Sequence, residues 1–121
     1  MYRILDKSEG HNIGVQLSGE ISKAERDEIV NNFKEIAGDH DKINILIELS
    51  NFKAFGSEAL AVDMEYLMPV IGKLNRFAFV SDSKWQEWYI DIDKTFAKLF
   101  GIEESYFDVD KIDDAWKWLK E

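Results

Sequence analysis

Cysteine is absent from the chain, so disulfide bonds and thiolate chemistry are excluded. No apolar run approaches the length that a membrane-spanning helix needs, and the first residues lack the apolar core of a signal peptide. We therefore expect a cytoplasmic protein without a transmembrane segment.

Positive charge is scarce: 15 Lys and Arg residues stand against 24 Asp and Glu residues, and the formal net charge is −9. Nucleic acids and anionic membrane surfaces bind through clustered basic side chains. This imbalance opposes both kinds of partner, and we expect no nucleic-acid binding.

Proline occurs once, and no Gly/Ser/Pro-rich linker interrupts the 121 residues. This length is usual for one domain that buries its own core, so we expect residues 1–121 to form a single domain. The lone proline, Pro69, lies within an apolar helical stripe that runs from Leu60 to Ile71. The helix is expected to end or bend around Leu67 to Pro69, either stopping early or forming a kinked edge to a groove.

Recognisable catalytic patterns are also missing. The two histidines, His11 and His40, fall in separate polar turns without metal-ligand spacing, and no nucleophile elbow, P-loop or dinucleotide-binding glycine pattern occurs. The acidic cluster of residues 108–114 lacks the spacing of a calcium loop and fits a helix start with surface charge. We expect no enzyme, no metal and no cofactor.

We expect the rest of the chain to be arranged around the stretch from Asn44 to Leu60. Residues 43–49 are too densely apolar for a strand with one wet face, which predicts a central parallel strand covered on both sides. Residues 50–56 are expected to form the loop at its carboxyl end, where open α/β sheets place binding crevices. Ser57 has the position of a helix N-cap.

The first part of the chain predicts a β-hairpin and a helix. Tyr2, Ile4 and the alternating Ile13, Val15 and Leu17 indicate two strands, with Gly19 ending the second. Ser22 and Glu25 have capping-box spacing, so a helix is expected from Lys23. Gly38 is expected to supply its left-handed C-terminal cap.

The second part predicts a strand at residues 77–80, an aromatic helix at residues 85–100 and an edge strand at residues 105–107. A last helix should follow, with Asp110 as its N-cap. The expected order is β-β-α-β-α-β-α-β-α. This is an α/β fold: a mixed five-stranded sheet flanked by four helices.

Several segments resemble the STAS fold of anti-sigma-factor antagonists, and in detail the divergent bacterial SpoIIAA-like group. The segments that carry the likeness are Leu17–Ser22, Leu46–Leu49, Arg76–Trp88, Tyr106–Phe107 and Ala115–Leu119. Of these, Arg76–Trp88 is the most specific. The resemblance covers nearly the whole chain.

The resemblance also implies roles for particular residues. In the antagonists, a kinase phosphorylates a serine in an Asp-Ser-Ser-Gly segment, and Ser57 falls at the matching place here. The sequence departs from that pattern, with Gly56 in place of the aspartate and Glu58 in place of the second serine. Ser57 therefore remains both a capping residue and a candidate phosphosite.

Two functions fit these observations. The fold is similar to lipid-carrying CRAL-TRIO domains, so the first is a non-enzymatic module that binds a small apolar or amphipathic ligand in the carboxyl-end crevice. The second is a protein-interaction or regulatory module, acting as a homodimer or binding a protein partner as the antagonists do. Both use the same candidate residues, which are Phe52, Phe55, Ser57, Trp85, Trp88 and Tyr89.

Overall fold

The computed structural model describes residues 1–55, 69–81 and 102–121. In chain order its elements are β1 (Tyr2–Ile4), β2 (Asn12–Ile21), α1 (Lys23–Asp39), β3 (Ile43–Phe55), β4 (Leu74–Ser81), β5 (Glu103–Asp108), a 3₁₀ turn (Val109–Lys111) and α4 (Ile112–Lys120). The expected helix of residues 85–100, and the part of the helix expected after Ser57 that precedes Pro69, lie outside the described residues.

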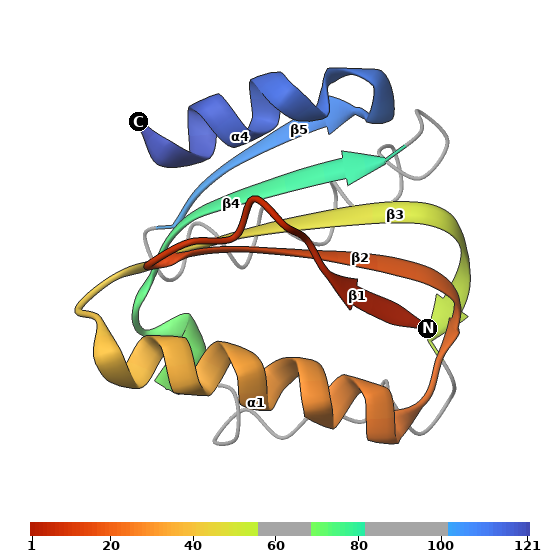
Figure 1. Ribbon diagram of the computed structural model, residues 1–121, viewed down its shortest axis with the longest axis horizontal. Coiled ribbons are helices and arrows are strands. Elements are labelled where there is room, and N and C mark those ends of the chain that lie inside the picture. Colours follow the sequence, from red (N-terminus) through yellow and green to blue (C-terminus); the bar gives the residue numbers. More distant parts are fainter. Residues whose placement is uncertain (56–68, 82–101) are drawn as a thin grey trace.

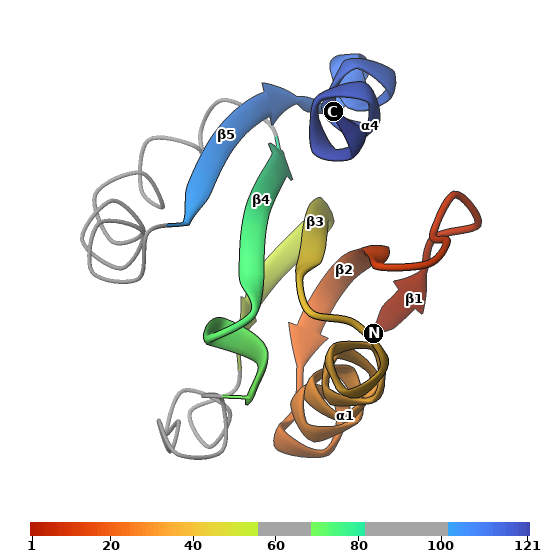
Figure 2. The same cartoon turned by 90° about the vertical axis from the view of Figure 1, so that its left-hand side faces the viewer.

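The strands form one five-stranded sheet in the order β1-β2-β3-β4-β5. β1 pairs antiparallel with β2, whereas every later neighbour pairs in parallel. The opening hairpin, the central position of β3 and the edge position of β5 are confirmed. Figure 1 shows α1 and α4 on opposite faces of this mixed sheet, as the α/β prediction required, and Figure 2 shows the same layers from the side.

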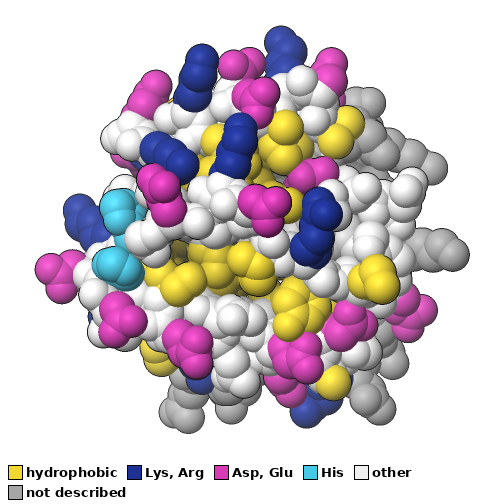
Figure 3. All heavy atoms as spheres, viewed as in Figure 1, with side chains coloured by type: hydrophobic (Ala, Val, Ile, Leu, Met, Phe, Trp, Pro, Cys, Tyr) yellow, Lys and Arg dark blue, Asp and Glu magenta, His cyan; other side chains and the backbone are white. Residues whose placement is uncertain are grey.

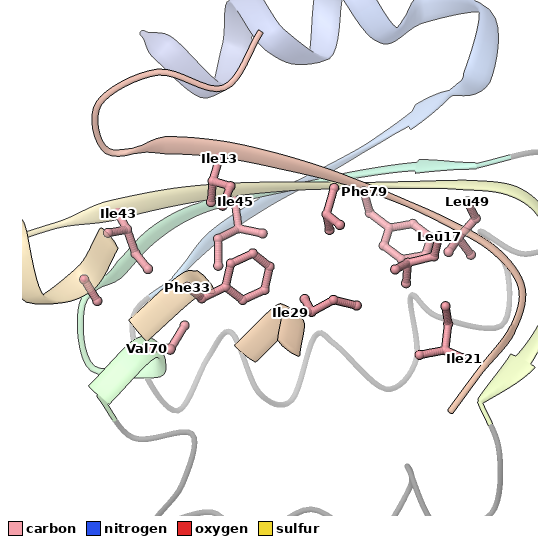
Figure 4. Close-up of a cluster of buried hydrophobic side chains, with 12 residues drawn as sticks. Ile13, Leu17, Ile21, Ile29, Phe33, Ile43, Ile45, Leu49, Val70 and Phe79 are labelled. Atoms are coloured by element: carbon pink, nitrogen blue, oxygen red, sulfur yellow. The ribbon is translucent and has the colours of Figure 1, made fainter. Parts of the chain in front are cut away.

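Alternate residues of the central strand serve two separate cores. Ile43, Ile45 and Leu49 pack toward α1, together with Ile29 and Phe33. Figure 4 shows those helix side chains pointing at the strands. On the other face, the buried cluster is formed by Leu46, Ala78, Val80, Ala115, Trp116 and Leu119. The prediction of a strand buried on both faces is confirmed.

The predicted start of α1 is confirmed, but its predicted end is wrong. The Ser22 hydroxyl accepts from the Glu25 amide, and the Glu25 carboxylate accepts from the Ser22 amide, so the capping box is present. The helix continues past Gly38, and the predicted glycine cap is wrong. The Lys73 ammonium donates to the carbonyl oxygens of Ala37 at 2.6 Å and His40 at 3.1 Å. A cation from a distant segment thus satisfies the helix end.

Two predicted strand ends are also wrong. β2 continues through Gly19, which adopts a φ of 62° at a bulge in the pairing, to Ile21. The expected loop at residues 50–56 is strand as far as Phe55, because β3 stays paired with this extension of β2. Asn51 has a φ of 53° there. Bulges break the alternation of apolar and polar residues by which strands are predicted, so the sequence pattern indicated neither extension.

The two remaining helical predictions have different outcomes. Residues 69–71 are helical, so the expected stop at Pro69 is wrong, whereas a bend there stays a prediction; Val70 joins the core on the α1 side. Asp110 is not an N-cap, because it lies inside the 3₁₀ turn that leads into α4 without a side-chain cap. Such turns are common at helix starts.

The end of α4 is fixed to the sheet by polar side chains. Buried Asn44 donates to the Asn12 side-chain oxygen at 2.8 Å and to the Leu119 carbonyl at 3.1 Å. Arg76 donates to the Trp118 carbonyl at 2.6 Å and lies over the Trp118 ring. Since these bonds satisfy carbonyls at the helix terminus, they hold α4 at a defined place on the sheet.

Candidate functional site

A buried carboxylate interrupts the apolar central strand. Glu48 is 8% exposed and lies on the face of the sheet that α4 covers, two residues beyond Leu46. The Gln16 side-chain amide donates to its carboxylate at 3.1 Å. No ion pair joins Glu48 to a cation among the described residues. Removing a carboxylate from water with only a neutral partner is costly, so this position calls for a cationic or donor group.

Above Glu48 the surface is hollowed. We call this hollow the sheet-face groove; its volume is about 320 Å³. Gln16 and Glu48 come from the strands, Leu5 and Lys7 from the segment after β1, and Ile112 and Trp116 from α4. The groove therefore joins a polar floor to apolar and aromatic walls, as small-molecule sites do.

Close packing between the sheet and α4 sets one wall of the groove. A Cβ atom placed on Gly14 would lie 2.5 Å from Cζ2 of the Trp116 ring. Only glycine lets the indole approach the strand this closely. Glycine at this position thus determines where the aromatic wall stands.

An ion pair crosses the rim. The Lys7 ammonium lies 2.7 Å from the Asp113 carboxylate, linking the segment after β1 to α4. The hydrogen bond from Lys7, and then its charge, lower the pKa of Asp113 below its ordinary value of 3.8. A second hollow of about 530 Å³ shares Lys7, Asp113 and Trp116 with the sheet-face groove. The rim thus carries both signs of charge.

Arg3 completes a row across three strands. It pairs in register with Gln16, which in turn pairs with Glu48, so the three residues lie on one face of the sheet. Arg3 is exposed and lines the groove, and it makes no ion pair with any described residue. Cationic and anionic side chains thus stand at the two ends of the row. This arrangement can bind a ligand that carries both charges.

The residues predicted to form the carboxyl-end crevice are only partly described. Phe52 and Phe55 belong to β3 rather than to a loop, and their backbones alone are described. Ser57, Trp85, Trp88 and Tyr89 lie outside the described residues. The crevice, its aromatic lining and the phosphosite therefore remain predictions.

The two histidines lie next to each other. The ring centroids of His11 and His40 are 5.9 Å apart, with the rings edge to face. Figure 3 shows the pair side by side on the surface, which agrees with their prediction as residues of polar turns. Parallel pairing of Asn12 with Asn44 brings their turns to one end of the sheet. Within the described ranges, no group of three or more metal-ligating side chains gathers.

Sequence reasoning missed the groove. Glu48 stands between Ile47 and Leu49 in a strand predicted to be buried on both faces, and a charged residue in that position was the available signal. Arg3 and Gln16 carried no comparable signal, because their pairing register came only with the folded sheet. The missed residues are thus those that tertiary structure brings together.

Comparison with solved structures defines the class of fold. The crystal structure of an uncharacterized protein from the DUF3478 family with a SpoIIAA-like fold, from Shewanella loihica PV-4, matches with a TM-score of 0.72. The match covers 98% of this chain and 92% of that chain at 15% sequence identity. It shows that this chain has the SpoIIAA-like version of the α/β fold.

The SpoIIAA-like family model matches residues 12–120. The chain therefore belongs to the SpoIIAA-like family, and the predicted resemblance is confirmed. No curated protein matches it. Membership and fold together support a regulatory or binding module in general. No helix in the described part of the chain is both long and apolar enough to cross a membrane.

Proposed function

We propose that this protein is a non-catalytic, STAS-like binding module that holds a small apolar or amphipathic ligand at the carboxyl ends of its central strands. Phe52, Phe55, Trp85, Trp88 and Tyr89 are the proposed lining, with Ser57 beside them. Binding pockets commonly combine aromatic walls with a few polar groups. The family supports binding or regulation in general, and the choice of ligand is the proposal.

The observation that carries the proposal is the divergence of β3 and β4. The two strands pair from Ile43–Leu74 to Glu48–Val80, after which β4 ends at Ser81. β3 continues to Phe55, paired with β2. Figure 1 shows β3 curling away from β4 at this end. Open α/β sheets bind ligands outside the carboxyl ends of their strands, which is the end at which β3 and β4 part.

Native mass spectrometry of the purified protein, compared with its denatured mass, tests this proposal. A bound ligand would give excess mass that is lost on denaturation. Replacing Phe52 or Phe55 with Ala should reduce that excess, whereas replacing Tyr2 in β1 with Ala should leave it unchanged. A protein of unmodified mass that takes up no fatty acid or other amphipath on titration would overturn the proposal.

The same spectra address the alternative of a protein-interaction or regulatory module. A dimer of unmodified chains, without bound ligand, would replace ligand carriage with self-association as the proposed function. A covalent increment equal to one phosphate would assign the regulatory switch to Ser57 once fragmentation located it there. Each result has a distinct mass signature.

A further inference from the structure

We propose that the sheet-face groove is a second binding site, which takes a small ω-amino acid: a ligand with a primary ammonium at one end and a carboxylate at the other. Its residues come from β1, the segment after it, β2, β3 and α4. The site is thus built from residues other than those of the carboxyl-end crevice, and its test is independent of that proposal.

The ammonium end is assigned by Glu48. This residue is 8% exposed and lines the groove, and its carboxylate accepts a hydrogen bond from the neutral Gln16 amide at 3.1 Å. A carboxylate has several acceptor positions, so one amide leaves capacity for an ammonium group. Charge-assisted hydrogen bonds of this kind are stronger than neutral ones, and more so where water is partly excluded.

Among the described residues, the two cations that line the groove do not pair with Glu48. Lys7 lines the groove, but its ammonium lies 2.7 Å from Asp113. Arg3 stands two strands away in the register, with Gln16 between, which corresponds to roughly 9–10 Å between the α-carbons. Both charges of the row are thus available to one ligand that spans it.

The carboxylate end is assigned by Arg3. Its guanidinium is exposed at the groove and unpaired among the described residues, and guanidinium groups bind carboxylates with two parallel hydrogen bonds. Leu5, Ile112 and Trp116 supply apolar surface for the methylene chain between the two ends. The volume of about 320 Å³ is at the small end of the range for ligand pockets.

Titration with 5-aminopentanoate, followed by proton–nitrogen NMR of the full chain, tests the proposal. We expect saturable shifts of the Gln16 side-chain amide and the Trp116 indole N–H. Pentanoate and pentylamine, which each lack one charged end, should bind about tenfold more weakly or less well still. No saturable shift with the double-ended ligand, or equal binding of all three, would overturn it.

One variant and its matched control test whether Glu48 binds the ammonium group. Glu48→Gln preserves shape and can still accept from Gln16, and it should weaken binding by about tenfold or more. Glu20→Gln removes an exposed carboxylate of β2 outside the groove and should bind as the unaltered protein does. If Glu48→Gln binds equally well, the ammonium assignment is wrong.

Arg3→Gln provides a test that does not depend on a buried substitution. The position is exposed in β1, so the fold should tolerate the change. This variant should lose the preference for 5-aminopentanoate over pentylamine and keep the preference over pentanoate. Retention of the full preference for both charged ends would show that Arg3 does not hold the carboxylate.

Discussion

Gly14 shows how one hydrogen atom in place of a methyl group can decide where an element packs. Its α-carbon faces the Trp116 ring so closely that a Cβ atom would lie 2.5 Å from Cζ2 and 2.6 Å from Cη2. The indole is 4% exposed and belongs to a packed cluster with Leu119. It cannot withdraw without disturbing α4, because well-packed interiors offer little free space.

Replacing Gly14 with Ala should therefore destabilise the protein. We expect a loss of roughly 1–3 kcal/mol in the free energy of unfolding, measured by urea denaturation, because overpacking forces the helix off the sheet. Adding Trp116→Phe, which removes the ring atoms nearest Gly14, should cost less in the Gly14→Ala background than in the unaltered protein. Strictly additive effects would mean that the contact with Trp116 is not the cause.

The Lys7–Asp113 pair predicts a pH effect at a single residue. The pKa of Asp113 lies below 3.8 because Lys7 donates to its carboxylate and adds positive charge. Carbon-detected NMR should show this carboxyl titrating below that value, and Lys7→Met should raise the pKa toward it.

A group whose pKa is lowered by folding contributes stability above its unfolded pKa and loses that contribution as the pH falls through the folded value. The bridge across the groove should therefore open in acid, below about pH 3.8. An Asp113 titration that is the same with Met at position 7 would contradict the assigned cause.

At the scale of elements, the two ends of α1 follow different rules. Its start is local, since Ser22 and Glu25 cap each other three residues apart. Its end depends on Lys73, which lies 36 residues beyond the Ala37 carbonyl it binds. A side chain that arrives from another segment removes the need for a left-handed glycine at the helix terminus.

Gly38 should then behave as an ordinary helical glycine. Gly38→Ala meets nothing within 4 Å and should raise the free energy of unfolding by roughly 0.5–1 kcal/mol, because alanine loses less backbone entropy. Gly19→Ala is the matched comparison: its φ of 62° should make the same change cost roughly 1–2 kcal/mol. Thermal denaturation of both variants checks the pair, and a destabilised Gly38→Ala would restore the capping role.

At the scale of the whole molecule, the charge of −9 sets a background repulsion. Raising NaCl from about 0.01 M to about 0.1 M shortens the Debye length from about 30 Å to about 10 Å. The melting temperature at neutral pH should rise with this screening. Near the isoelectric point of about 4.7 the gain should vanish, because little net charge remains to be screened. An equal gain at both pH values would point to a general salt effect rather than repulsion.

Much of the fold was predictable because its signals are local. Alternation predicted the hairpin, the dense apolar run of residues 43–49 predicted a doubly covered central strand, and Ser22 with Glu25 predicted the start of α1. The family likeness followed from short segments spread over nearly the whole chain. Side-chain periodicity and helix capping depend on residues that are close together in the sequence, so the sequence alone predicts them.

The places where elements end, and the groove itself, were decided by tertiary structure. β3 continues to Phe55 because the bulged end of β2 stays beside it, and α1 needs no glycine cap because Lys73 reaches it. Arg3, Gln16 and Glu48 form a row only when three strands adopt one register. Pairing between distant segments sets these features, and no stretch of neighbouring residues contains that information.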